Sequence, residues 1–240
     1  MKILLTNDDG IESPILPLLI PVLSRFGEVT VVAPKVEQSG KSQAIDFRNE
    51  IEIKRTDRFG DVRAYAVDST PADCVRFGVL GLKQRYGLVF SGINRGYNLG
   101  DDIAYSGTVG AILEGARLGI RGVALSADPN AFLESIHALD AVADFFCAKC
   151  LLERHSLYNV NLPPTVNGFA ITRQGGPFYT DDFEYRGNDH YIQVGDPLEY
   201  ESRDLSVDID AVRAGRVSIT PLTAARMDAA AYERLSREIP

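Results

Sequence analysis

Short apolar runs and helical patterns alternate along the first two thirds of the chain. Runs of strand length, dominated by aliphatic and β-branched residues, occupy positions 2–5, 28–34, 87–91 and 122–126. Patterns with helical spacing occupy positions 14–23, 70–82, 106–119 and 135–152. This alternation predicts an α/β fold with right-handed crossovers and a doubly wound, mostly parallel sheet.

Proline positions qualify two of these helices. In the helix at 14–23, Ser13 is a possible cap and Pro14 suits the first turn, but an interior Pro21 predicts a kink, a break or a shifted start. Thr70 and Pro71 predict a capped helix start. Between these helices, residues 45–67 alternate apolar and polar positions, which predicts a β excursion ending at 64–67.

The pattern changes after residue 152. Short strands are predicted at 160–163 and 168–172, and another at 216–222 precedes a terminal helix. Residues 180–210 carry ten acidic side chains, so we predict an exposed arm or long hairpin that contributes nothing to the core. The predicted organisation is therefore a core with the functional site over residues 1–155, and C-terminal strands, acidic arm and helix over 156–240.

Composition narrows the class of protein. The 240 residues are 45% hydrophobic and carry a net charge of −8, which disfavours binding to a nucleic-acid polymer and suits metal cations. No run is long enough to span a membrane, and the first residues do not form a secretory leader. The three cysteines, Cys74, Cys147 and Cys150, are too few for a disulfide framework. We expect a cytoplasmic protein in which Cys147-x-x-Cys150 serves helix packing.

Oxygen-bearing side chains follow three of the predicted strands. Asp8 and Asp9 come after the first strand, Ser39 after the second, and Asn94 after the strand at 87–91. Carboxyl ends of parallel strands meet at one sheet edge, where α/β proteins bind ligands. Gly10 permits the turn that lets both aspartates face one ion. The set has the chemistry expected for Mg²⁺ or Mn²⁺.

A second candidate is an anion site at the start of the predicted helix at 106–119. Ser106, Gly107 and Thr108 would direct backbone N–H groups and two hydroxyls at an anion, although simple capping explains the same residues. The preceding loop contains Asn94 and Asn98 among three glycines, Gly92, Gly96 and Gly100. It either approaches a ligand closely or is merely flexible.

Six ordered motifs together resemble the SurE family of stationary-phase survival proteins, which are metal-dependent nucleotidases acting on nucleoside monophosphates. The motifs cover residues 7–10, 33–40, 70–75, 91–96, 98–103 and 105–109. The resemblance is dense to about residue 126 and returns at 159–163 and 217–222. It implies a Rossmann-like core with a C-terminal extension that exchanges between subunits, and hence a homodimer or homotetramer.

The resemblance also implies roles for individual residues. One divalent metal ion per subunit is expected on Asp8, Asp9, Ser39 and Asn94, and the phosphate or substrate positions are Asn7, Gly40, Asn98, Ser106, Gly107 and Thr108. The chain departs from the family pattern at Ile15, Pro17, Pro21 and Asp46, which bear on entry to the site and on substrate preference.

We therefore expect a phosphomonoesterase that hydrolyses nucleoside monophosphates, a 5′/3′-nucleotidase, with short polyphosphate as a further expected substrate. Asp8 and Asp9 are the expected catalytic residues; whether Asp8 only binds the ion or also acts as base or nucleophile stays open.

Two alternatives use the same acidic pair. A phosphoacceptor module without turnover needs a further aspartate at a later strand end, where Ser91 and Ser126 stand instead. A covalent aspartyl phosphatase prefers Asp-x-Asp. The three histidines, His137, His155 and His190, lie away from the predicted strand ends, so a serine–histidine triad is not expected.

Overall fold

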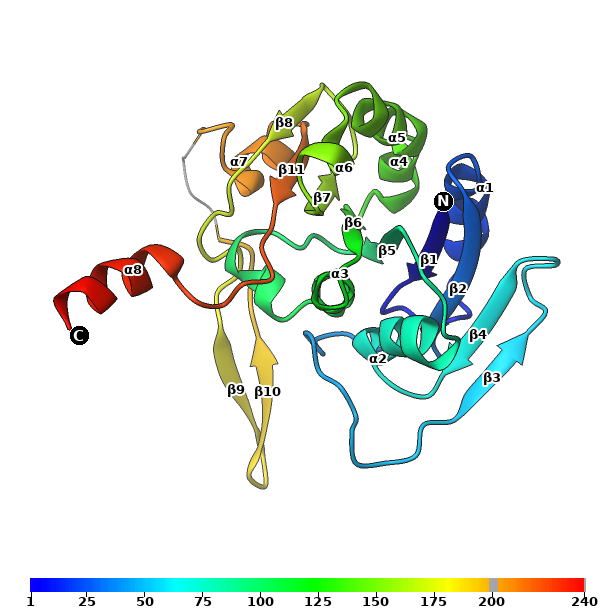
Figure 1. The fold of residues 1–240 in the computed structure, drawn as a ribbon. Coiled ribbons are helices and arrows are strands. Elements are labelled where there is room, and N and C mark those ends of the chain that lie inside the picture. Colours follow the sequence, from blue (N-terminus) through cyan, green and yellow to red (C-terminus); the bar gives the residue numbers. More distant parts are fainter. Residues whose placement is uncertain (199–202, 240) are drawn as a thin grey trace.

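The protein is built on one nine-stranded, mostly parallel sheet (Figure 1). The computed structural model describes residues 1–198 and 203–239. Its sheet strands are β1 (Lys2–Thr6), β2 (Glu28–Pro34), β3 (Ile53–Thr56), β4 (Arg63–Val67), β5 (Leu88–Arg95), β6 (Arg121–Ala127), β7 (Leu157–Leu162), β8 (Phe169–Ile171) and β11 (Val217–Pro221). They are ordered β3-β4-β2-β1-β5-β6-β7-β11-β8, with β3 antiparallel to β4 and β11 antiparallel to β7. The predicted fold class is confirmed.

Helices cover both faces of this sheet. They are α1 (Leu16–Ser24), α2 (Pro71–Arg76), α3 (Gly107–Arg117), α4 (Phe132–Ile136), α5 (Leu139–Ala148), α6 (Leu151–Arg154), α7 (Asp208–Arg213) and α8 (Ala229–Glu238), with a π-helical turn at Phe77–Gly81 and a 3₁₀ turn at Gly100–Ala104. None of the helices within the described ranges has the length and apolar content to cross a membrane.

The alternation of side chains along β1 divides the core into two layers. Ile3 and Leu5 are fully buried in one cluster with Leu19 of α1, whereas Leu4 lies in the other cluster with Ile112 of α3. Successive side chains on a strand point to opposite faces, so a parallel strand covered by helices is apolar at every position. This explains the unbroken apolar run in the sequence.

Local signals placed some boundaries well and others poorly. Thr70 caps α2, as predicted, by accepting a hydrogen bond from the backbone N–H of Asp73. Ser13 does not cap α1, which begins at Leu16 with Ile15 at the N-cap and no side-chain cap, so the shifted start is the outcome of the proline positions. Pro21 is accommodated inside the helix.

Three further boundaries differ from the predictions. Residues 45–52 form no strand; only β3 and β4 do. Strand β5 continues to Arg95, into the glycine-rich stretch that we predicted to be a loop. The single helix predicted over 135–152 is wrong, because α4, α5 and α6 divide it and Cys150 adopts a left-handed conformation (φ 49°) at the last break. Cys147 and Cys150 are exposed rather than packed.

The acidic stretch at residues 180–210 contains an exposed part and a buried part. Strands β9 (Asp182–Gly187) and β10 (His190–Val194) form the predicted exposed hairpin, which projects away from the sheet in Figure 1. The prediction that the whole stretch lies outside the core is wrong at its end, because Asp208 and Asp210 on α7 are buried. Strands β7, β8 and β11 extend the main sheet, and the division at residue 155 stays a prediction.

Candidate active site

The turn after β1 presents the two predicted catalytic aspartates. Asn7 closes it: its carboxamide oxygen accepts from the Gly10 N–H (3.1 Å) and its Nδ2 donates to the Gly10 carbonyl (3.0 Å). Gly10 has φ +101°, a conformation that L side chains rarely adopt. Asn7 is fully buried and both ends of its carboxamide are bonded to Gly10, so it holds the turn that carries Asp8 and Asp9; its contact with a substrate stays a prediction.

Asp8 lies against the N-terminus of α3. Its side chain is buried, and Oδ1 accepts a hydrogen bond of 2.6 Å from the Thr108 hydroxyl. Ser106 caps the helix by accepting from the Val109 N–H at 3.1 Å. A Cβ at Gly107 would come within 3.2 Å of Asp8 Oδ2, so glycine permits this close approach. The predicted anion site and the acidic pair therefore meet.

The loop after β2 borders the same turn. The Gln38 N–H donates to the Asp8 carbonyl at 2.7 Å, which ties the loop to the acidic pair. Ser39 is exposed and donates to Glu37 Oε1 at 2.6 Å. Gly40 has φ +70° with open space around it. The loop thus leaves Ser39 and Gly40 accessible, and it adds Glu37, an acid that sequence reasoning missed although it stands two positions before Ser39.

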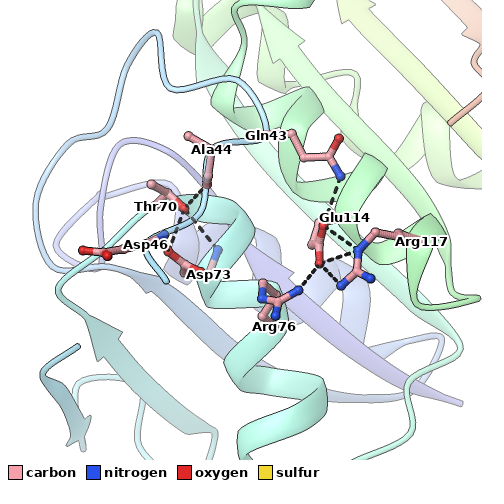
Figure 2. Close-up of polar contacts among 8 residues, drawn as sticks. All are labelled: Gln43, Ala44, Asp46, Thr70, Asp73, Arg76, Glu114 and Arg117. Atoms are coloured by element: carbon pink, nitrogen blue, oxygen red, sulfur yellow. Dashed lines mark hydrogen bonds and ion pairs between the residues drawn. The ribbon is translucent and has the colours of Figure 1, made fainter. Parts of the chain in front are cut away.

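Buried Glu114 of α3 anchors the next part of this loop (Figure 2). Its Oε2 accepts from Gln43 Nε2 at 3.0 Å, and Oε1 accepts from Arg76 of α2 at 3.0 Å and from Arg117 at 2.7 Å. Burial alone would raise the pKa of Glu114, but the donated hydrogen bonds outweigh it and lower the pKa. One carboxylate thereby joins two helices to the loop.

A second anchor lies at the start of α2, also drawn in Figure 2. The Thr70 hydroxyl donates to the Ala44 carbonyl at 2.6 Å, and the Asp46 N–H donates to Asp73 Oδ2 at 2.8 Å. The Asp46 carboxylate turns instead to the backbone N–H groups of residues 48 and 49. Asp46, where the chain departs from the family pattern, therefore caps a turn at the loop surface.

Of the two predicted asparagines, Asn94 lies near the end of β5 and Asn98 follows that strand. Asn94 is half-buried and donates from Nδ2 to the Gly96 carbonyl at 2.9 Å, which leaves its carboxamide oxygen for a ligand. Asn98 is buried and donates to Ser126 Oγ at 2.7 Å. The Asn98 backbone N–H donates to Asn161 at 2.9 Å. These partners at the ends of β6 and β7 were missed because nothing nearby in the sequence links them to Asn98.

A buried carboxylate of α7 fixes the loop that leads to Ser106. Asp208 Oδ2 accepts from the Gly100 N–H at 2.9 Å, and Oδ1 accepts from the Gly175 N–H at 2.8 Å. Gly100 has φ +53°, and a Cβ there would lie 1.9 Å from the Gly176 carbonyl oxygen. The C-terminal part of the chain therefore shapes the loop between Asn98 and Ser106.

Negative charge accumulates at the turn. Burial, and then the charges of Asp8 and Glu37, raise the pKa of Asp9 to about 6, against a smaller lowering by the charge of Arg95. Burial also raises the pKa of Asp8, against the hydrogen bond from Thr108. A bound divalent cation would relieve this repulsion, and carboxylate, hydroxyl and amide oxygens suit Mg²⁺ or Mn²⁺.

The four predicted metal ligands do not form a closely packed cluster of side chains. In the part of the chain that the structure covers, no cluster of three or more His, Cys, Asp and Glu side chains has metal-binding geometry. The predicted set supplies only two carboxylates, and Ser39 and Asn94 would complete it with neutral oxygens. Within residues 1–198 and 203–239, Ser39 bonds to Glu37 and Asn94 bonds to Gly96, and neither side chain forms a hydrogen bond with either aspartate. Ligands of one ion meet through the ion, so direct contact is not required.

Comparison with known proteins gives one consistent answer. The family model for survival protein SurE matches residues 3–181. The 5′-nucleotidase SurE of Pseudothermotoga lettingae is 42% identical over 232 residues, covering 93% of this chain and 89% of that protein. The 5′-nucleotidase SurE 1 of Thermus thermophilus is 41% identical, with 93% and 92% covered. The crystal structure of the SurE protein from Aquifex aeolicus superposes with a TM-score of 0.82 at 32% identity and covers 100% of both chains. The chain belongs to the SurE family.

Proposed function

We propose that this protein is a divalent-metal-dependent 5′-nucleotidase that hydrolyses nucleoside monophosphates. The observation that carries the proposal is the 2.6 Å hydrogen bond from Thr108 to Asp8, which joins an acidic pair to a helix N-terminus. A cation-binding group and an anion-binding group thus lie in contact, as hydrolysis of a phosphate ester requires. The names of the relatives from Pseudothermotoga lettingae and Thermus thermophilus support the same activity.

Three parts of the chain contribute to phosphate binding: the start of α3, Thr108 and Asn98. The backbone N–H groups at the start of α3, with the macrodipole, attract the phosphate, and the close approach at Gly107 brings it next to Asp8. Thr108 holds Asp8 in one orientation. Asn98, fixed by Ser126, extends the donor set from the loop after β5. The site therefore orients the ester between α3 and the acidic turn.

The residues present fit one divalent ion, Mg²⁺ or Mn²⁺. Asp8, Asp9, Ser39 and Asn94 would hold it, and the raised pKa of Asp9 is a sign of the charge that it would neutralise. When bound, such an ion polarises the phosphate and lowers the pKa of a water molecule. The side chain of Asp8 is buried and bonded to Thr108, which favours a role as ligand over a role as nucleophile.

The test is phosphate release from purified protein stripped with a chelator and then titrated with Mg²⁺ or Mn²⁺. We expect turnover of 5′-AMP only with metal, and loss of turnover in Asp9→Asn but not in Asp61→Asn, an exposed acid between β3 and β4. Parallel assays with 3′-AMP and polyphosphate test the broader predictions. Full activity in chelator, or full activity of Asp9→Asn in saturating metal, contradicts the proposal.

The alternative of a phosphoacceptor without turnover gives a different result. Treatment with acetyl phosphate would then leave phosphate on the protein without release into solution. A covalent aspartyl intermediate would be trapped by a metal fluoride and found by mass spectrometry. The hydrogen bond from Thr108 to Asp8 supports neither alternative.

We also propose that the hairpin β9–β10 mediates homo-oligomer formation in a cytoplasmic enzyme. Phe183 and Tyr185 on β9 and Tyr191 on β10 are each more than half exposed, at 66%, 58% and 62%. Large exposed apolar side chains on a projecting hairpin are typical of an interface. Light scattering after size-exclusion chromatography should show a dimer or tetramer that Tyr191→Asp dissociates; an oligomer unchanged by Tyr191→Asp contradicts this role of the hairpin.

A further inference from the structure

Strands β6 and β7, which are neighbours in the sheet (Figure 1), carry three buried polar side chains on one face. Ser126 of β6 and Asn161 of β7 are register partners, and Asn159 stands two positions before Asn161 on the same face. All three are fully buried. Parallel strands covered by helices are normally apolar at such positions, so these residues have a role that aliphatic side chains would not serve.

All three side chains bond to Asn98 in the loop after β5. Asn161 holds both sides of its backbone: Oδ1 accepts from the Asn98 N–H at 2.9 Å, and Nδ2 donates to the Asn98 carbonyl at 3.0 Å. Asn159 Nδ2 donates to the same carbonyl at 2.7 Å. The Ser126 hydroxyl accepts from the Asn98 side chain at 2.7 Å. The backbone and the side chain of Asn98 are therefore both fixed by residues of two other strands.

The partners also determine which way each carboxamide points. A carbonyl only accepts and a backbone N–H only donates, so Asn159 must direct its nitrogen at Asn98. Its Oδ1 is left buried and without a hydrogen bond within residues 1–198 and 203–239. A buried acceptor that lacks a partner lowers stability, and leucine, which branches at the same atom, would avoid that cost. Stability alone therefore does not account for asparagine at position 159.

The loop is also held on either side of Asn98. The Gly96 N–H donates to the Ala127 carbonyl at 3.0 Å, and the Gly100 N–H donates to Asp208 at 2.9 Å. Between these two points, the Asn98 backbone is oriented by the asparagines of β7. A donor that is already held in one direction binds an anion without the entropy cost of ordering the loop.

We propose that Asn159 and Asn161 are positioning residues that set the affinity for the phosphate group through Asn98. The assignment rests on the proposed nucleotidase function, in which Asn98 belongs to the phosphate donor set. The bond to Ser126 uses one of the two hydrogens on the Asn98 nitrogen, and the second is the one directed at phosphate. This contact exists with bound substrate and in the transition state, so its loss raises KM and leaves kcat nearly unchanged.

The experiment follows the effect of Asn159 through Asn98. Wild type, Asn159→Leu, Asn98→Ala and the double variant are assayed in saturating Mn²⁺ with 5′-AMP and with glycerol 2-phosphate, and inorganic phosphate is the competing inhibitor. In Asn159→Leu we expect KM for both esters and the inhibition constant of phosphate to rise at least fivefold, with kcat within threefold. The Mn²⁺ concentration for half-maximal activity should change less than twofold. Asn161→Ala should raise the same constants, and it replaces Asn159→Leu if that variant does not fold.

Two comparisons separate positioning from a general loss of structure. In the double variant, KM should equal that of Asn98→Ala, because Asn159 has no effect once the donor that it positions is gone. Tyr158→Phe is the matched control on β7. Its hydroxyl donates to the Leu151 carbonyl at 2.8 Å, so the variant also loses a buried hydrogen bond, but on the opposite face of the strand. Its KM should equal that of wild type.

The outcomes distinguish the two proposals. If wild type releases no phosphate from either ester, the nucleotidase function fails and the positioning role with it. If wild type is active but Asn159→Leu and Asn161→Ala keep KM within twofold, the positioning role alone is overturned. An unchanged KM in Asn98→Ala, a further rise of KM in the double variant, or an equal rise in Tyr158→Phe overturns it as well. Circular dichroism and thermal melting confirm that each variant is folded.

Discussion

Replacing Asp9 with asparagine should stabilise the metal-free protein at neutral pH. Asp9 is half-buried, and within the described chain its carboxylate has no hydrogen-bond partner. Burial first, and then the charges of Asp8 and Glu37, raise its pKa from 3.8 to about 6. The ionised carboxylate of Asp9 therefore lowers the free energy of unfolding. Asparagine has nearly the same shape and carries no charge, so the substitution removes this cost.

The pH window follows from the direction of the shift. Between 3.8 and about 6 the folded protein binds more protons at Asp9 than the unfolded chain does, so the free energy of unfolding falls as pH rises. Above 6 the whole penalty remains, and below 3.8 it is absent. The interval corresponds to about 3 kcal/mol at about 1.4 kcal/mol per pKa unit. Solvent screening of a half-buried group reduces this to about 1–2 kcal/mol.

Thermal melting in chelator, at pH 4 and at pH 8, measures the effect. For a chain of this length, Asp9→Asn should raise Tm by about 2–6 °C at pH 8 and leave it unchanged at pH 4. Saturating Mg²⁺ or Mn²⁺ should raise the wild-type Tm and raise that of the variant much less, because the variant has lost a ligand. Asp61→Asn, in an exposed turn, should show neither effect. A lower Tm at pH 8, or an equal rise at both pH values, would refute the reasoning.

Three further substitutions test the packing around the site. Thr108→Val removes the donor to Asp8 and should lower kcat about 10- to 100-fold with little change in Tm, whereas Thr108→Ser keeps most activity; equal turnover in both variants would contradict this. Glu114→Gln leaves two arginines without a counter-charge and should cost about 2 kcal/mol in urea unfolding, and a neutral result would show that the loop needs no charged anchor. Asp208→Ala, which leaves buried backbone N–H groups including that of Gly100 unpaired, should cost about 3 kcal/mol in the same assay, more than Asp208→Asn; no difference from wild type would mean that water replaces the carboxylate.

Sequence reasoning succeeded where the signal was local. Thr70 and Ser106 were identified as candidates for helix starts because each accepts from an N–H group only three residues later in the chain. Strand β2 was predicted with its observed bounds from a continuous β-branched run ending in proline. These features depend on a few consecutive residues, so tertiary contacts do not change them.

It failed where conformation depends on distant partners. The helical pattern over 135–152 continues through the left-handed turn at Cys150, so periodicity alone does not reveal the break. The acidic stretch before β11 indicated exposure throughout, yet Asp208 is buried because it meets the N–H of Gly100, 108 positions earlier. Burial of a carboxylate requires partners that only the folded chain supplies.

By itself, then, the sequence determined the element types, the parallel sheet and the arrival of Asp8 and Asn94 at one edge of it, because side-chain periodicity and strand direction are local properties. Only the tertiary structure decided what these residues contact. In the folded chain Thr108 donates a hydrogen bond to Asp8, Asn7 bonds to Gly10 within the turn after β1, and a cavity lies beside Asp9. Hydrogen bonds, charge and free volume join segments about a hundred residues apart, so they are properties of the packed chain and not of any stretch within it.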